Sequence, residues 1–122
     1  MVKIHRGFAL FLWSAAICVV LIGSLSPSDS ALMRTVDGLD INNKILHFSA
    51  YVCLAILPVL GIRKRNKALM AAASMVLLGL LVEFAQNLVP GRTPEVADEV
   101  ANILGVASGI AIAFPFRRTL TG

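Results

Sequence analysis

The feature that most constrains this chain is a run of nineteen residues, 7–25, that contains no charged side chain. At about 1.5 Å of rise per residue, a helix of that length crosses a hydrocarbon layer about 30 Å thick. Similar apolar runs follow at about 44–62, 68–89 and 100–116. Backbone groups inside a bilayer must be hydrogen-bonded within their own segment, so each run is expected to be a helix. The sequence therefore predicts an all-α, polytopic membrane protein: a single domain, residues 1–122, with a bundle of four transmembrane helices.

The composition supports this class and excludes others. Hydrophobic residues make up 57% of the chain, charged residues make up 15%, and the mean hydropathy is +0.82. This balance is unusual for a soluble protein. The net charge is +4, but the basic side chains are dispersed among the connections, so we expect no nucleic-acid partner. Cys18 and Cys53 lie inside apolar runs without a metal-binding neighbour, and we interpret them as packed thiols.

The first apolar run has a second interpretation. Lys3 and Arg6 precede it, and the segment Ser24, Leu25, Ser26 resembles a cleavage site, as in a secretory signal peptide. The run is long for such a peptide, and three further spans follow it. We therefore expect it to remain in the protein as the first transmembrane helix.

The charges alternate along the chain between the segments that connect the spans. The two ends and the second connection are basic, whereas the first and third connections are mainly acidic. The positive-inside rule places basic segments in the cytoplasm. We therefore predict a multi-pass protein of the inner (cytoplasmic) membrane, with both termini cytoplasmic and both acidic connections outside. The basic residues are Lys3, Arg6, Arg63, Lys64, Arg65, Lys67, Arg117 and Arg118, and the acidic ones are Asp29, Asp37, Asp40, Glu95, Asp98 and Glu99.

Polar side chains gather at matching depths near the predicted outer ends of the last three spans. Within each span, spacings of three or four residues place them on one helix face. Ionisable groups inside a bilayer are costly and often functional. The sequence therefore predicts that the three faces meet in one polar site. The faces carry Lys44, His47 and Tyr51; Glu83, Gln86 and Asn87; and Asp98 and Asn102.

The chemistry of these side chains suggests roles for them. His47 and Glu83 are the candidate catalytic residues, acting as acid and base. A structural alternative stays open, in which the polar groups only fasten helices together, Lys44 snorkels to the interface and Arg92 is solvated. Glu95 and Glu99 are expected to form a solvated rim. The candidate ligand-binding residues are Lys44, Gln86, Asp98, Asn102 and Arg92, which lies in a turn shaped by Pro90, Gly91 and Pro94.

Three smaller features complete the predictions. Gly105 and Gly109 form a GxxxG motif, which we expect to pack within the bundle rather than between two copies. His47, Glu83 and Asp98 could hold a metal, but a single histidine gives such a site little support, so we expect no metal and no cofactor. A short surface helix is predicted from the spacing of Leu32, Met33, Val36 and Leu39.

Three segments resemble the VanZ-like family of small bacterial membrane proteins. They are NKILHFSAY in the second span, EFAQNLVPGR at the end of the third and DEVANILGVASG leading into the fourth. The resemblance covers about residues 40–110. Asn43 departs from it, because the family commonly has Asp there, and Asp40 lies close enough in sequence to replace that acid. The resemblance implies a role in the cell envelope; the founding member is associated with resistance to teicoplanin, and most relatives have no assigned activity.

The leading hypothesis is an outward-facing polar pocket that binds or modifies an anionic lipid or cell-wall precursor. Arg92 and Lys44 would hold the anion. Two alternatives stay open: a small transporter or proton relay that uses Glu83 and His47, and a non-catalytic membrane assembly module. Membrane lipids are the expected partners, association with a second copy stays open, and the sequence does not decide whether the protein is an enzyme.

Overall fold

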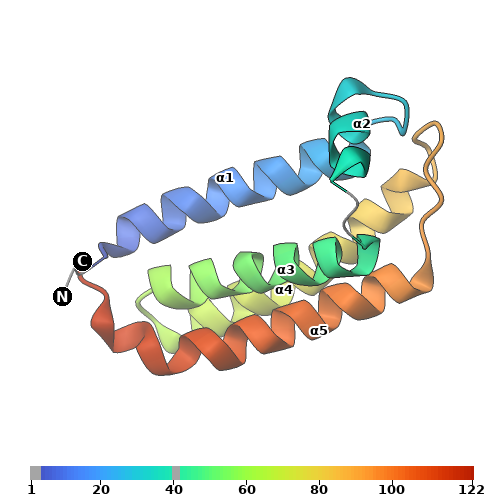
Figure 1. The fold of residues 1–122 in the computed structure, drawn as a ribbon. Helices are drawn as coiled ribbons and strands as arrows, with labels where there is room; N and C mark the ends of the chain where they lie inside the picture. The colour runs from blue at the N-terminus through green and yellow to red at the C-terminus, as the bar shows by residue number, and fades with distance from the viewer. Residues whose placement is uncertain (1–3, 40–41) are drawn as a thin grey trace.

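The computed structural model describes residues 4–39 and 42–122, and over these ranges the protein is helical with no β-strand. Of the described helices, four are long and apolar enough to cross a membrane: α1, α3, α4, and α5 together with its continuation η1. The long helices run alternately up and down along the bundle (Figure 1). The predicted all-α bundle with four long apolar helices is confirmed. The elements are α1 (Arg6–Leu25), α2 (Ala31–Gly38), α3 (Asn43–Gly61), α4 (Arg65–Gln86), α5 (Val96–Ala113) and the 3-10 helix η1 (Phe114–Thr119).

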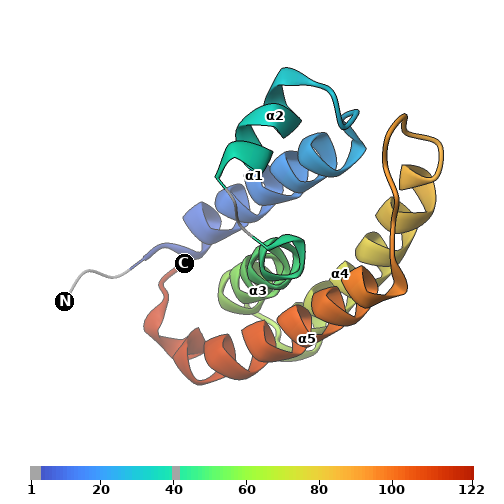
Figure 2. The same ribbon diagram turned by 45° about the vertical axis from the view of Figure 1, so that its right-hand side comes forward.

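Helix α3 is the centre of the bundle. It lies between α1 on one side and α4 and α5 on the other (Figure 2). Its C-terminal half carries fully buried side chains, among them Leu54, Ala55 and Val59. Helix α1, by contrast, is peripheral, because Ala9 is its one buried residue. Most of the surface of α1 is therefore available to surrounding lipid.

Two glycines bring α5 into close contact with α3. A Cβ atom added at Gly105 would lie 2.6 Å from the Phe48 carbonyl oxygen, and one added at Gly109 would lie 2.6 Å from the Val52 carbonyl oxygen. Such distances leave no space for a side chain, so the two helices approach backbone to backbone. The structure thus places this GxxxG motif inside the chain's own bundle.

Arginines close the end of the bundle where α1 begins and η1 ends (Figure 1), which we call the basic end. The last carbonyl groups of a helix have no partner within the helix. At the end of α3, Arg6 donates to the Leu60 carbonyl at 2.7 Å, and Arg117 donates to the carbonyls of Val59 and Ile62, both at 3.0 Å. These bonds also join the first and last helices to the central one.

The opposite end of the bundle, which we call the polar end, holds the α1–α2 connection, α2 and the α4–α5 loop. The predicted short helix is α2, and the Ser30 hydroxyl caps it by accepting the Met33 backbone N–H at 3.2 Å. Helix α4 ends at Gln86, earlier than the limit of 89 expected for the third span, because the chain then enters turns. One turn requires Gly91, whose φ is 76° and whose missing side chain would meet Ser28.

We predict that Gly105→Ala destabilises the protein by about 1–3 kcal/mol, because the added methyl group would overlap the α3 backbone. The measurement is thermal or denaturant-induced unfolding of the purified protein in detergent micelles. Gly23→Ala in α1 is the matched control, since nothing lies within 4 Å of a Cβ there; it should be neutral or stabilise by up to about 1 kcal/mol. Equal effects of the two substitutions would contradict the close α3–α5 contact.

A polar cavity as the candidate functional site

An ion pair between α3 and α5 lies at the polar end. The Lys44 ammonium is 2.6 Å from Asp98 Oδ1 and 3.1 Å from Glu95 Oε2. Asp98 is 5% exposed, and its other oxygen accepts the Glu95 backbone N–H at the start of α5. The helix N-terminus stabilises a carboxylate at this position. Asn43 also donates to Asp98 Oδ1 at 3.4 Å, so the buried acid is held by partners from two helices.

A second layer of polar contacts lies one helical turn deeper. His47 Nδ1 is 3.1 Å from Asn102 Oδ1, and the Asn102 amide donates to Glu99 Oε2 at 3.3 Å. Because the Asn102 oxygen must accept, this arrangement assigns the proton on His47 to Nδ1. His47 Nε2 then lies 3.9 Å from Asp98 Oδ2, which connects the two layers.

Arg92 and Gln86 hold the end of α1. The Arg92 guanidinium donates to the carbonyl oxygens of Ser26, at 2.8 Å, and Gly23, and it contacts the Met33 sulfur at 2.9 Å. Gln86 donates to the Ser24 carbonyl at 3.0 Å. The unpaired carbonyls at the end of α1 are therefore satisfied by side chains from the end of α4 and the loop after it.

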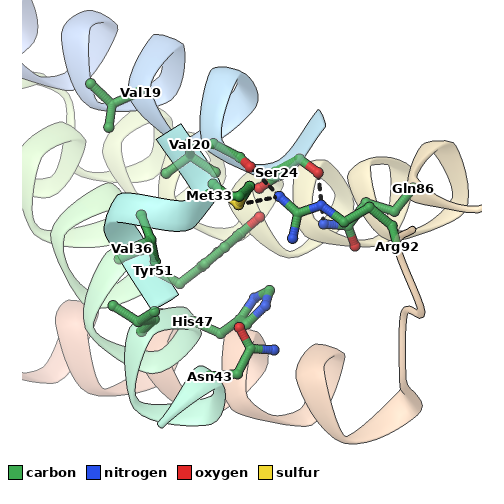
Figure 3. Close-up of a pocket in the computed structure, with 13 residues that line it drawn as sticks. Val19, Val20, Ser24, Met33, Val36, Asn43, His47, Tyr51, Gln86 and Arg92 are labelled. Carbon is green, nitrogen blue, oxygen red and sulfur yellow. Dashed lines mark hydrogen bonds between the residues drawn. The ribbon is translucent and has the colours of Figure 1, made fainter. Parts of the chain in front are cut away.

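These elements surround a cavity with two adjoining parts, an inner one of about 230 Å³ and an outer one of about 250 Å³. Figure 3 shows Arg92 and Gln86 on one side of the inner part, His47 and Asn43 across from them, and the Tyr51 hydroxyl directed toward the guanidinium. The inner part is otherwise mainly apolar and the outer part mainly polar. The parts share Met33, Val36, Asn43, Leu46, His47, Gln86 and Arg92; the inner one adds Val19, Val20, Gly23, Ser24, Ala50 and Tyr51, and the outer one adds Ser28, Asp37, Gly91, Thr93, Pro94 and Asp98.

The structure brings together most, but not all, of the side chains singled out in the sequence. His47, Gln86, Arg92 and Asp98 line the cavity. Lys44 and Asn102 do not line the cavity, but each contacts a residue that does. Lys44 donates to Asp98, and Asn102 is hydrogen-bonded to His47. The cavity thus has a directly exposed set of polar groups and a supporting set.

Glu83 lies elsewhere. It lines neither part of the cavity, and no hydrogen bond or ion pair joins it to His47 in the described part of the chain. It lies instead near Glu99 on α5, close enough for the two carboxylates to repel each other. The structure therefore does not assemble the acid–base pair of His47 and Glu83 expected from the sequence.

One expectation about the acidic residues needs correction. Glu99 is not part of a solvated rim, because its carboxylate packs against Gly79 and Asn102 and one of its oxygens is buried without a hydrogen-bond partner. Glu95 is exposed, yet it also pairs with Lys44. Asp40, considered as a replacement for the family's acid at position 43, lies outside the described residues. Asp98 on α5 accepts hydrogen bonds from both Lys44 and Asn43.

Some residues that line the cavity have no sequence signal for such a role. Met33 and Ser24 carry no charge and belong to segments read as a surface helix and a membrane span. The Met33 thioether contacts Arg92, and the Ser24 backbone carbonyl accepts a hydrogen bond from Gln86. The turn shaped by Pro90, Gly91 and Pro94 drew attention to Arg92, but it did not indicate which groups Arg92 binds.

The sequence pattern of the VanZ/LLP1 family matches residues 11–117. The chain belongs to this family. The match extends beyond residues 40–110 and includes most of α1, so all four long helices of this VanZ/LLP1 protein are part of the family pattern. No curated protein and no solved structure matches the chain. Together with the four apolar helices, the match identifies a multi-pass membrane protein.

A metal centre gains no support from the geometry. In the ranges that the structure covers, no three of the His, Cys, Asp and Glu side chains come together as ligands. His47 and Asp98 are neighbours, but Glu83, the third candidate, is not beside them. The polar layers of this VanZ/LLP1 protein are instead arranged as donors and acceptors for one another and for the cavity.

We predict that Lys44→Met lowers the free energy of unfolding of the VanZ/LLP1 protein, since it leaves the Asp98 carboxylate buried without its cation. The loss is smaller than for a fully buried pair, because the Lys44 side chain is 39% exposed. Unfolding in detergent measures it. Asp98→Asn combined with Lys44→Met is expected to cost less than the two single substitutions together; additive effects would contradict the pairing.

Proposed function

We propose that this VanZ/LLP1 protein resides in the cytoplasmic membrane and binds the phosphate-bearing headgroup of an amphiphile in the cavity. The observation that carries the proposal is the cavity's polarity, which changes from charged and polar at the outer part to mainly apolar at the inner part. An amphiphile has the same division, with a charged group at one end and hydrocarbon behind it. A soluble polar metabolite would leave the apolar inner part unfilled.

The distribution of charge favours Arg92 as the group that binds the anion. Lys44 is next to two carboxylates, which compensate its charge. Arg92 has uncharged partners, two backbone carbonyls and a thioether, and no carboxylate pairs with it in the described residues. Its positive charge is therefore available to a ligand. An arginine fork is well suited to a phosphate.

The inner part of the cavity suits a hydrocarbon chain. Val20, Leu46 and Ala50 line it, together with Val19. Val19 is also 69% exposed on the outside of the bundle, so the cavity wall reaches the surface that faces lipid. This position would let a ligand's chain extend from the cavity into the bilayer beside α1.

Binding fits the structure better than transport. Between Tyr51 and the basic end, α3 fills the interior of the bundle with Leu54, Ala55 and Val59, each 0% exposed. No polar side chain of α3 continues the cavity through this layer. A transporter needs a route to both sides of the membrane, and these buried side chains close the path along α3 from the cavity opening at the polar end toward the basic end. The charge pattern of the connections predicts that this opening faces away from the cytoplasm.

We predict that Ala50→Leu lowers the amount of phosphate-bearing lipid retained by the purified protein at least about tenfold. The larger side chain would occupy the inner cavity, and retention is measured as phosphorus per protein after delipidation and exposure to a lipid extract. Ala15→Leu, on the exposed face of α1, adds the same groups outside the cavity and should retain lipid as the wild type does. Equal retention by both variants would argue against a bound amphiphile.

We also predict different effects for the two residues suggested as acid and base. His47→Ala should reduce lipid retention by about threefold or more, because it removes a cavity wall and the partner of Asn102. Glu83→Gln should leave retention unchanged, since Glu83 lies outside the cavity. The same retention assay is used, with both variants first shown to be folded. A loss caused by Glu83→Gln alone would contradict this assignment of the site.

A further inference from the structure

The outer part of the cavity carries a negative group as well as a positive one. Asp37 and Arg92 both line it. Arg92 comes from the α4–α5 loop and Asp37 from the last turn of α2, so the two charges come from different walls of the same cavity. A site for a simple anion would be expected to exclude an acid from its lining.

Asp37 lacks the partners that a structural acid usually has. Its carboxylate forms no ion pair within the described ranges, and Arg34, one helical turn earlier on α2, does not pair with it. It also lies at a helix C-terminus, where the backbone carbonyls make a negative charge unfavourable and a cation favourable. A cation bound here would interact with both the carboxylate and the helix end.

Asp98, the other acid that lines the outer part, is already occupied. One of its oxygens accepts from Lys44 and Asn43, and the other accepts from the backbone at the start of α5. Its charge is compensated by Lys44. Among the described residues that line the cavity, Asp37 is therefore the acid that remains available to a ligand.

We propose that the ligand is zwitterionic, with a phosphate that binds Arg92 and a neighbouring ammonium group that binds Asp37, as in a phosphoethanolamine headgroup. This inference rests on the proposed binding of a phosphate-bearing amphiphile and specifies its chemistry. An ammonium group supplies N–H donors that a carboxylate accepts as charge-assisted hydrogen bonds. The outer part, about 250 Å³, has the capacity for a headgroup that carries both charges.

The test compares two lipids that share their acyl chains and phosphate. The full-length protein in detergent micelles is mixed with equal amounts of dioleoyl phosphatidylethanolamine and dioleoyl phosphatidylglycerol, and the bound lipids are counted by native mass spectrometry. The wild type is expected to prefer phosphatidylethanolamine. Asp37→Asn should reduce that preference by about fivefold, the effect of one exposed ion pair. Asp37 is exposed, so the substitution should not disturb folding.

Asp29→Asn is the matched control, because Asp29 is an exposed acid of the same segment that lies outside the cavity. It should keep the wild-type preference. An unchanged preference in Asp37→Asn, or a wild type that binds both lipids equally but loses both in Ala50→Leu, would overturn the zwitterion while leaving the amphiphile in place. A wild type whose lipid binding does not respond to Ala50→Leu would overturn the proposed function itself.

Soluble phosphoethanolamine separates the headgroup from the chains. If the ligand is a lipid, phosphoethanolamine should displace bound phosphatidylethanolamine at least about 100-fold less effectively than the lipid does, since it gains nothing from burial of hydrocarbon. Equal displacement would support the two-charge headgroup site and overturn the role of the apolar inner cavity.

Discussion

The rest of the structure depends on the close contact that Gly105 and Gly109 make between α5 and α3. The two helices run in the same direction, and the glycines fix one sliding position between them, since the nearest atom to each is a backbone carbonyl oxygen of α3, with a Cβ atom of α3 beside it. Lys44 and Asp98, 54 residues apart, then lie at the same height. His47 and Asn102 follow one turn deeper at nearly the same separation. A shift of one turn along this contact would separate both pairs and leave a buried acid without a cation.

A second constraint comes from the membrane, where the carbonyls at the end of a helix find little water. Arginines at both ends of the bundle donate hydrogen bonds to these carbonyls. Arg6 and Arg117 bind the end of α3, and Arg92 binds the end of α1. Each guanidinium has several donors in a fixed plane and can satisfy more than one carbonyl. These carbonyl partners carry no net charge, so they do not compensate the positive charge of the arginines. At the polar end, the charge of Arg92 faces the cavity.

Sequence patterns predicted the helices and much of the site, since apolar length and spacings of three or four residues depend only on residue type. His47 and Asp98 were identified in this way. The position of Glu83 was not predictable, because three residues advance a helix by about 300° and leave Glu83 and Gln86 about 60° apart. That difference directs Gln86 toward α1, where it binds Ser24, and Glu83 toward α5. The partners of Arg92 were also hidden, since backbone carbonyls have no signature in the sequence.

Arg92 has a thermodynamic consequence, because one guanidinium both fastens the end of α1 and faces the cavity. The α1 helix is the most weakly buried part of the bundle, so its attachment is the step most sensitive to small changes in free energy. Binding of the proposed anion to Arg92 and the attachment of α1 would therefore be linked equilibria. By reciprocity, a ligand that binds more tightly when α1 is attached also strengthens that attachment by the same factor. For the proposed ligand, occupancy of the cavity and order in the first helix would report the same coupling free energy.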